Sequence, residues 1–555
     1  MMFQRRWISE DAFIDLRVVR NLLAGHGPVY NIGERVEAFT NPLWVALLTG
    51  SGALGLPLEA CAVYIGLACS IVALVVAQHW SRRLHAAQRG EPRTFALPLG
   101  TLVVAALPPL WDFGTSGLET GLMFLWLAWS FALCVRVCER SGPDASRRSR
   151  RLTLTAFVAG LGPLIRPDLG VFTVAFALFI AFTIVSAEDA RIRGLVRATT
   201  ACVFVPLAYQ VFRMGYYAAL VPNTALAKEA GLLFWSQGWL YLRNAVDTYW
   251  LWFPFGMLLW VLTASVSRWR REGRAERAVL ASAVASAALV HGTYIVAIGG
   301  DFMHVRMLLP SILALALPVG TVVVTRQQAI ARRSPWILEA ALVTAVWALL
   351  CAVYMRPANE GELGAFGITD ERSFYVSQLN ERNPVNAAQY RRFIPIHSLA
   401  YTRADETRGR VLDIDGRVVP LTWRMPREID AALTSVNIGA QGYLVGPRVH
   451  VIDRRGLADP IASRLRLDVR GRPGHEKELN DLWILARFAQ APPADASSAV
   501  KVLSCGGLQQ VLAGIDEPLT VRRFVDNLRV AIAQRGLRIP ADPEEARATF
   551  CGSGR

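Results

Sequence analysis

Long apolar runs alternate with short Arg-rich loops over the chain up to about Tyr354. A helix that spans a bilayer needs about 20 mostly apolar residues. The shorter run 42–56 ends in a Gly-Leu-Pro break and predicts a helix at the membrane interface. The other runs predict about ten transmembrane helices: 58–80, 95–111, 118–138, 152–166, 168–186, 195–213, 246–266, 278–298, 307–325 and 336–355.

After Arg356 the long apolar runs stop and the composition becomes that of a globular domain, large enough for its own core. Within it, Val449–Asp453 reads as a strand. The predicted fold is an α-helical polytopic membrane protein with a C-terminal extracytoplasmic α/β domain. Its predicted divisions are a first extracytoplasmic loop (1–57), a transmembrane domain (58–355) and an extracytoplasmic soluble domain (356–555).

Composition agrees with a membrane protein. Of the 555 residues, 53% are hydrophobic and only 19% charged, a combination that soluble domains rarely show. The net charge of +15 sits largely in alternate loops, so it indicates topology and not a nucleic-acid partner. The Arg-rich loops are predicted to be cytoplasmic: 82–93, 136–151, 191–197, 268–277 and 326–333. The loops with little positive charge are predicted to face outward, with both termini: 112–117, 166–168, 214–245 and 299–306.

Two of the eight cysteines, Cys505 and Cys551, lie in the tail, whereas the others lie in or beside apolar runs. An isolated pair in an extracytoplasmic domain is a disulfide candidate, and two free thiols are the alternative. Closing that loop would stabilise the domain by about 4 kcal/mol on the chain-entropy model.

The acidic pair Glu10-Asp11 lies between apolar residues near the N-terminus. Mutual repulsion and partial burial would raise the pKa of one carboxyl group. Such a carboxylate can accept the proton of an attacking hydroxyl. The alternative is a helix start in which Ser9 is the cap and the acids occupy the first turn.

The outward loops collect further polar residues. Asp301, His304 and Arg306 follow Gly299-Gly300, in a loop that could contact a phosphate or sugar, or simply connect two helices. Asp301 and His304 alone are too few ligands to argue for a metal site, and none is predicted.

Four other charged residues on these loops have a plain alternative. Arg166 and Asp168 flank a proline and can pair with each other. Lys228 is a candidate phosphate contact or an interfacial side chain, and Glu119 can favour the start of a helix. In the tail, His475 follows Gly474 in an Arg-rich loop, where an exposed structural histidine is the plainer interpretation.

Several blocks, in order along nearly the whole chain, resemble the terminal β-(1→2)-arabinofuranosyltransferases of mycobacterial and corynebacterial cell walls, in the GT-C superfamily. Those blocks are 4–8, 20–25, 33–38, 115–119, 212–217, 224–228, 235–238, 299–304, 451–453 with 456–457, and 474–475. The resemblance implies decaprenylphosphoryl-arabinofuranose as donor and nonreducing ends of arabinan in arabinogalactan or lipoarabinomannan as acceptor. It implies no nucleotide sugar and no cofactor; the expected partners are membrane lipid, the lipid-linked donor, the arabinan and other cell-wall enzymes.

The family's catalytic acids, carried over to this chain, fall on Glu10 and Asp11. The family pair looks like Asp-Asp, so Glu10 departs from it and we place the main role on Asp11. The resemblance also implies a transmembrane helix before this loop, and we expect the natural chain to have one before Met1. Arg17, Arg20 and Glu37 of the first loop join the predicted substrate-binding residues.

The predicted mechanism places the donor phosphate near Arg166, Lys228 or Arg306, with Asp11 as the base. The loop 214–245 is predicted to be a gate, and the tail a lid or acceptor cradle. Two rival interpretations are another polyprenyl-phosphate-sugar transferase, such as a mannosyltransferase, and a non-enzymatic transporter of cell-wall lipids. A transporter should carry ionisable groups in the middle of its spans, whereas these lie at the outer ends.

Overall fold

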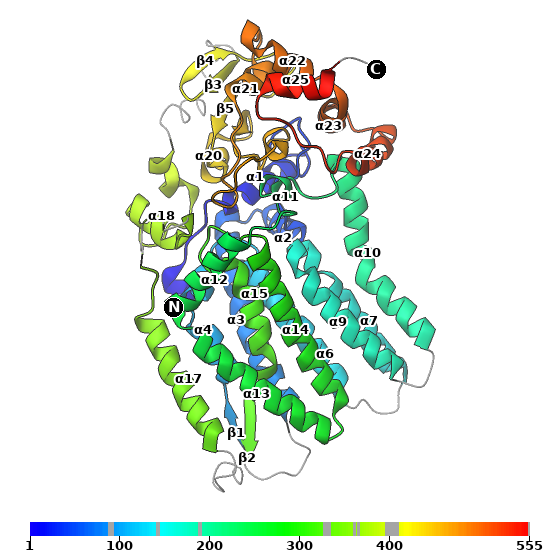
Figure 1. Ribbon diagram of the computed structural model, residues 1–555, viewed down its shortest axis with the longest axis vertical. Coiled ribbons are helices and arrows are strands. Elements are labelled where there is room, and N and C mark those ends of the chain that lie inside the picture. The colour runs from blue at the N-terminus through cyan, green and yellow to red at the C-terminus, as the bar shows by residue number, and fades with distance from the viewer. Residues whose placement is uncertain are drawn as a thin grey trace. The chain divides into compact units, whose positions relative to one another are not determined.

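A computed structural model describes residues 1–86, 94–139, 145–186, 191–325, 335–358, 362, 364, 367–394 and 410–552 (Figure 1). Its contacts divide the chain into two compact units. We call Met1–Trp7, Val63–Leu207 and Phe234–Phe374 the helical unit. We call Ile8–Ala62, Ala208–Leu233 and Tyr375–Arg555 the mixed unit. The first loop therefore shares a compact unit with the tail, an association that the sequence does not express.

The helical unit consists almost entirely of helices, as their apolar composition predicts. Its helices are α3 (Leu58–His85, from Val63 on), α4 (Leu99–Ala106), α5 (Pro108–Phe113), α6 (Thr120–Cys138), α7 (Ala145–Gly160), α8 (Gly162–Ile165), α9 (Gly170–Val185), α10 (Arg191–Tyr217, to Leu207), α12 (Trp235–Tyr249), α13 (Trp252–Arg271), α14 (Ala275–Ala297), α15 (Leu309–Ala316) and α17 (Pro335–Val353). Short 3-10 helices are η1 (Met2–Arg5), η2 (Pro167–Leu169), η3 (Arg306–Leu308) and η4 (Leu317–Val319).

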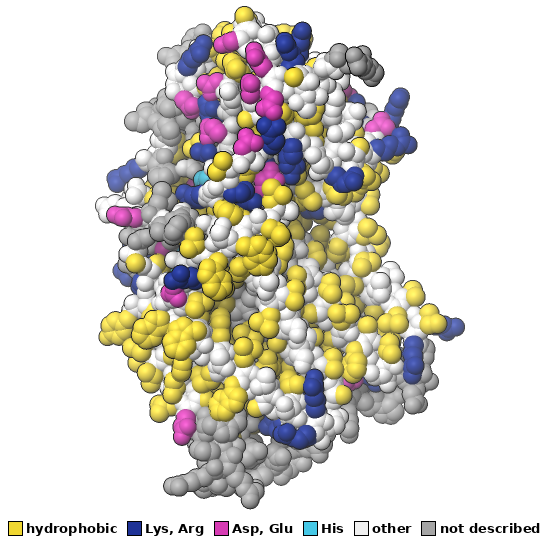
Figure 2. Space-filling view, viewed as in Figure 1, with side chains coloured by type: hydrophobic (Ala, Val, Ile, Leu, Met, Phe, Trp, Pro, Cys, Tyr) yellow, Lys and Arg dark blue, Asp and Glu magenta, His cyan; other side chains and the backbone are white. Residues whose placement is uncertain are grey.

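Among the described residues, five helices are long and apolar enough to cross a membrane: Leu58–His85, Thr120–Cys138, Pro167–Val185, Arg191–Tyr217 and Ala275–Ala297. A sixth span is possible in the pair α12 and α13, which meet at 89°. Figure 2 shows hydrophobic side chains across the surface of these helices. The chain is a polytopic membrane protein, as predicted.

Three of the ten expected spans fold as shorter or broken elements. The segment 95–111 is divided between a strand, α4 and α5, because Pro98, Pro108 and Pro109 interrupt the helix. The segment 307–325 is divided between η3, α15, η4 and β2. The segment 152–166 is divided between α7 and α8, whereas the predicted span 336–355 coincides closely with α17. For these segments the count of about ten stays a prediction, and 87–93, 140–144 and 326–334 of the Arg-rich loops lie outside the described residues.

Two of those segments pair their ends as strands. Antiparallel β1 (Thr94–Leu97) and β2 (Val322–Thr325) align Thr94 with Thr325 and Leu97 with Val322. The uninterrupted run of β-branched residues in Val322–Thr325 favours this conformation over a helix end.

The mixed unit contains a four-stranded sheet of order β4-β3-β5-β6. Strands β3 (Val411–Ile414) and β4 (Arg417–Pro420) form an antiparallel hairpin, while β5 (Ala431–Ser435) and β6 (Val449–Asp453) continue the sheet in parallel. Helix α20 (Ile438–Val445) makes the crossover between them. The fully buried β6 is the strand that the sequence predicts. The predicted fold class, a helical polytopic membrane protein with an α/β tail, is confirmed.

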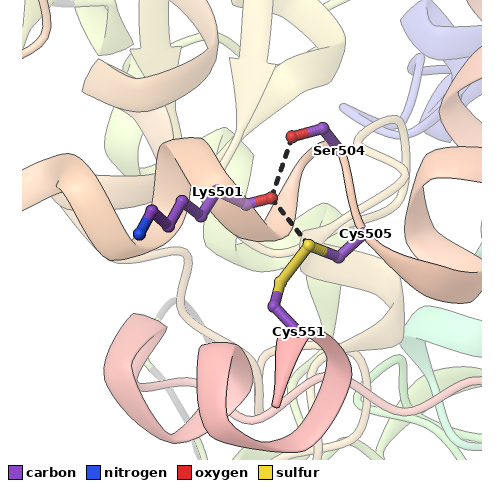
Figure 3. Close-up of a disulfide and its surroundings, with 4 residues drawn as sticks. All are labelled: Lys501, Ser504, Cys505 and Cys551. Atoms are coloured by element: carbon purple, nitrogen blue, oxygen red, sulfur yellow. Dashed lines mark hydrogen bonds between the residues drawn. A yellow bond between two sulfur atoms is a disulfide. The ribbon is translucent and has the colours of Figure 1, made fainter. Parts of the chain in front are cut away.

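Helices surround this sheet and close its core. They are α1 (Ala12–Leu23), α2 (Pro42–Ala53), α11 (Asn223–Ala227), α18 (Glu371–Leu379, from Tyr375 on), α21 (Asp481–Phe488), α22 (Ser497–Val502), α23 (Gly506–Asp516), α24 (Val521–Ala533) and α25 (Pro543–Cys551), with 3-10 helices η6 (Ala387–Phe393), η9 (Ala462–Arg464) and η10 (Ala494–Ala496). One hydrophobic core joins Ile32 and Val36 of the first loop to Trp483 and Ile539 of the tail. The last residue of α25, Cys551, is joined to Cys505, the residue before α23, in a disulfide (Figure 3).

Candidate active site

The predicted catalytic pair lies at the start of α1 in the mixed unit. Asp11 occupies the N-cap position and makes no side-chain capping bond, so Ser9 is not the cap of this helix. Glu10 is buried, with 6% of its surface exposed, whereas Asp11 is half-buried. The two carboxylates therefore occupy different environments, although they are neighbours in sequence.

The Glu10 carboxylate lies at the beginning of α20. Its Oε1 accepts a hydrogen bond of 2.8 Å from the backbone N–H of Ala440. Burial and, secondly, the nearby charge of Asp11 together raise the pKa of Glu10 from 4.5 to about 8, against the hydrogen bonds from Ala440 and Gly439. Near neutral pH this side chain can hold a proton, while its oxygen still accepts from the first turn of α20.

Gly439 permits this close approach. A Cβ atom there would lie 1.9 Å from the carbonyl oxygen of Glu10 and 2.8 Å from its Cδ atom. The position thus excludes any side chain, because the nearest obstacle is backbone. Sequence reasoning missed Gly439, since nothing in a single sequence pairs positions 10 and 439.

Arg17 fastens α1 to the tail. It is 2% exposed, and its guanidinium donates to the carbonyl oxygens of Tyr30 (2.7 Å), Val449 (2.6 Å) and Gly446 (3.0 Å), and of Gly442. Arg20 donates to the carbonyl of Tyr443 (2.7 Å) and lies over its ring. These contacts give both side chains a positioning role within the protein, and substrate contact by either stays a prediction.

Glu37 is held in an internal ion pair. Its carboxylate accepts from Arg213 Nε (2.5 Å) and from the Tyr209 hydroxyl (2.6 Å), and only 1% of the residue is exposed. Burial raises the pKa of Glu37 against the opposing effect of Arg213. With its oxygens engaged in this way, Glu37 connects the first loop to the end of α10.

A group of positive charges lies where the loop after β6 meets Lys228, the residue after α11. Lys228 packs beside Gly474, where a Cβ atom would lie 3.2 Å from its Cε atom. Arg455 Nη1 donates to the carbonyl oxygens of His475 (3.1 Å) and Lys477 (3.0 Å). Burial lowers the pKa of His475 to about 4, and the charges of Arg472, Lys228 and Arg455 add to this effect. His475 is therefore a neutral, half-buried residue within a group of positive charges, which we call the basic loop (Lys228, Arg455, Arg472, His475).

Strand β6 links the basic loop to the acidic pair. Asp453, at the end of β6, is close enough to raise the pKa of Glu10 through its charge. Its own pKa is raised to about 6 by burial, against hydrogen bonds from Ala458 and Arg455. Arg455 thus belongs both to the turn around Asp453 and to the basic loop.

The remaining predicted residues form a second cluster, in the helical unit. Arg166 makes a bidentate pair with Asp168 (2.7 and 2.6 Å), which in turn contacts His291 (2.7 Å). Glu119 lies 3.4 Å from Arg306 and 3.7 Å from Arg166, and Asp301 lies 3.9 Å from Arg306. Three carboxylates therefore face two arginines, so this cluster carries no excess positive charge. The prediction that Arg166 and Asp168 pair with each other across the proline is therefore confirmed.

His304 is buried beneath α12. Its ring nitrogens contact Asn244 Oδ1 and the Tyr249 hydroxyl (3.1 Å). The loop that carries it is further fixed by the Tyr241 hydroxyl, which donates to the carbonyl of Met303 (2.9 Å). His304 thus positions the loop 299–306 against α12.

Two ionic networks escaped sequence reasoning. In the helical unit, Arg5 makes a bidentate pair with Asp112 (2.7 and 2.8 Å). In the mixed unit, Arg487 lies 2.5 Å from Glu34, and burial raises the pKa of Glu34 to about 7 despite that arginine. Partners separated by hundreds of residues leave no spacing signal in one sequence.

The tail matches a known family model. Residues 425–549 match the AftB family C-terminal domain. Over 95% of its length the chain is 34% identical to the terminal β-(1→2)-arabinofuranosyltransferase of Mycobacterium tuberculosis, covering 91% of that protein. It is 31% identical to the Corynebacterium glutamicum protein of the same name, over 98% of this chain and 85% of that one.

The chain belongs to this family of arabinofuranosyltransferases. It is thus a glycosyltransferase, as the resemblance implied, and the alternative of a non-enzymatic lipid transporter is set aside. Among solved structures, the oligosaccharyltransferase of Archaeoglobus fulgidus is similar at a TM-score of 0.37 and 12% identity, over 82% of this chain and 59% of that one.

Proposed function

We propose that this arabinofuranosyltransferase transfers arabinofuranose from decaprenylphosphoryl-arabinose to the nonreducing ends of cell-wall arabinan, forming terminal β-(1→2) linkages on the outer side of the membrane. The acceptor hydroxyl attacks the anomeric carbon, the bond from that carbon to the phosphate oxygen breaks, and the polyprenyl phosphate leaves. The lipid-linked sugar is the donor, and no separate cofactor takes part.

Asp11 is the proposed base in this reaction. The observation that carries this choice is the contrast between the two acids: Glu10 is buried with its carboxylate against Ala440, whereas Asp11 is half-buried at the head of α1. A base must reach the proton of an incoming hydroxyl, which favours the more accessible carboxylate. Glu10 then holds α20 in place beside it.

The test of Asp11 is Asp11→Asn in the full chain, assayed for transfer from lipid-linked arabinose to a synthetic arabinan acceptor. We expect kcat to fall by about 100-fold or more, since general-base catalysis contributes on that order. Asp495→Asn, at an exposed position of the mixed unit, is the matched control and should keep wild-type activity. Wild-type transfer by the Asp11 variant would refute the assignment.

Of the three cations considered for the donor phosphate, Lys228 is the one that we propose. Arg166 and Arg306 face Glu119, Asp168 and Asp301, whose charges already balance theirs. Lys228 instead lies in the basic loop, in the same compact unit as Asp11 and linked to it through β6. Positive charges gathered at one place attract the negatively charged phosphodiester of the donor.

Lys228→Met tests the basic loop. Loss of one phosphate contact should raise the donor KM by roughly tenfold with a smaller effect on kcat, because the contact exists in both the ground state and the transition state. Lys501→Met, on the exposed face of α22, is the matched control. An unchanged donor KM in the Lys228 variant would contradict a phosphate at this place.

A further inference from the structure

Helix α12 has three distinct faces. At about 100° per residue, Gln237, Tyr241, Ala245 and Tyr249 fall on one side, and all four are buried. Gly238 lies beside them and allows α14 to approach so closely that a Cβ atom would lie 1.7 Å from the carbonyl oxygen of Val296. This side packs against the rest of the helical unit.

An apolar face lies next to the buried one. Leu242, Trp235, Val246 and Trp239 share an arc of about 60° on the helix. Both tryptophans are exposed, Trp235 by 51% and Trp239 by 57%. Large aromatic residues rarely face water in such a group without a partner.

The third face is polar and lies beyond the apolar one. It contains Ser236, Arg243 and Asp247, and the last two form an ion pair of 3.6 Å with both side chains more than 60% exposed. An order of buried, apolar and charged faces around one helix is typical of a helix that lies at the boundary of lipid and water.

The orientation of α12 follows from the helix after it. Helix α13 has 20 residues and is a candidate span only as a pair with α12, which meets it at 89°. If α13 runs along the membrane normal, α12 lies parallel to the surface. With 15 residues, or about 22 Å, α12 is also too short to cross a hydrocarbon core of about 30 Å.

The corner between the two helices carries more aromatic residues. Trp250 and Trp252 are exposed by 56% and 65%, and Trp260 follows on α13 at 47%. Exposed tryptophans therefore occur on the apolar face of α12, at the corner and on α13. Tryptophan is enriched at that depth of a bilayer, where an apolar ring meets a polar boundary.

We propose that α12 is an interfacial helix whose face of Leu242, Trp235, Val246 and Trp239 lies in the membrane, at the boundary between lipid headgroups and acyl chains. Its buried face holds the loop 299–306 through Tyr241, Asn244 and Tyr249. The depth of α12 thus sets the depth of that loop, at the level where a lipid phosphate lies. The membrane contact itself does not depend on the proposed function.

A depth measurement tests this placement directly. A nitroxide is attached at Trp239→Cys or, for the polar face, at Asp247→Cys in the full chain, reconstituted in lipid nanodiscs. Trp260→Cys on α13 gives the lipid reference, and the wild-type chain gives the background from native cysteines. Collision of the label with oxygen, which concentrates in lipid, is compared with collision with a water-soluble nickel chelate.

We expect the ratio of oxygen to nickel collisions at position 239 to be several-fold higher than at 247 and to approach that at 260. A label at 239 that meets nickel as readily as the label at 247 would overturn the proposal, and so would a label protected from both reagents, which indicates a protein partner. If Trp239→Cys does not fold, Trp235→Cys provides the same measurement on the same face. Transfer activity is not needed for this readout.

Discussion

At the scale of single residues, Glu10 and Asp11 illustrate how neighbours in sequence acquire different chemistry. Glu10 is enclosed by its contacts with Gly439 and Ala440, while Asp11 stays half-buried. In the proposed mechanism, a raised pKa is therefore not by itself the mark of the base. Accessibility separates the roles that we propose for the two carboxylates.

The raised pKa of Glu10 predicts a pH dependence of stability. The pKa rises from 4.5 to about 8 on folding, so between these values the folded chain holds a proton that the unfolded chain releases. The contribution of Glu10 to the free energy of unfolding therefore falls as pH rises through that window. The Glu10→Gln side chain carries no charge at any of these pH values. The midpoint temperature of unfolding of this variant should therefore rise relative to that of wild type as pH rises from about 5 to about 9.

The control for this prediction is Glu381→Gln, at an exposed carboxylate, whose difference from wild type should stay constant with pH. Thermal unfolding of the three chains in detergent provides the comparison. A difference between Glu10→Gln and wild type that does not change with pH would show that Glu10 is not the buried acid described here.

Much of the residue-level chemistry could be proposed from the sequence, but not its geometry. The positions of Asp11 and Lys228 were visible because acids and lysine are conspicuous between apolar runs. The sequence does not show that Arg17 and Arg20 donate to backbone carbonyls, since every one of these acceptors except Tyr30 lies more than 400 positions away. Every residue has a backbone carbonyl group, so the sequence does not indicate which of them accepts a given hydrogen bond.

At the scale of elements, the attachment of α1 to the tail depends on the hydrogen bonds of Arg17. Its buried guanidinium donates to four carbonyl oxygens and to the Asn31 side chain. Arg17→Lys replaces a planar fork with a single ammonium and leaves acceptors unsatisfied. We expect the mixed unit to lose about 3 kcal/mol of unfolding free energy.

Chemical denaturation of the full chain in detergent measures this loss. The matched control is Arg522→Lys, whose side chain is 94% exposed and which should change stability by less than about 0.5 kcal/mol. Equal stability of the two variants would mean that the Arg17 contacts contribute little.

The elements also show where hydrophobic patterning succeeds and fails. Helices α3, α6, α9 and α14 coincide closely with the predicted spans. An uninterrupted apolar run satisfies its backbone hydrogen bonds in a bilayer by forming a helix. The predicted span 246–266 instead begins at Trp252, since residues 246–249 belong to α12. Hydropathy does not register a corner between two apolar helices.

At the scale of the whole molecule, the direction of the chain across the membrane remains a prediction of charge alone. The Arg-rich loops are expected on the cytoplasmic side and the tail outside. Alkaline phosphatase fused after Arg555 should be active, whereas green fluorescent protein fused there should be dark, because each folds on only one side of a bacterial membrane. The reverse pattern would place the tail, and Asp11 with it, in the cytoplasm.

The buried hydrogen bonds of Arg17 can form only after its distant partners have been synthesised. Its partner Gly442 is made 425 residues later, and a ribosome adding about 5–20 residues per second needs roughly 20–85 seconds to reach it. Throughout that interval the first loop lacks the carbonyl groups and the glycine that enclose it. The first loop therefore cannot complete its folded contacts until most of the tail has been synthesised.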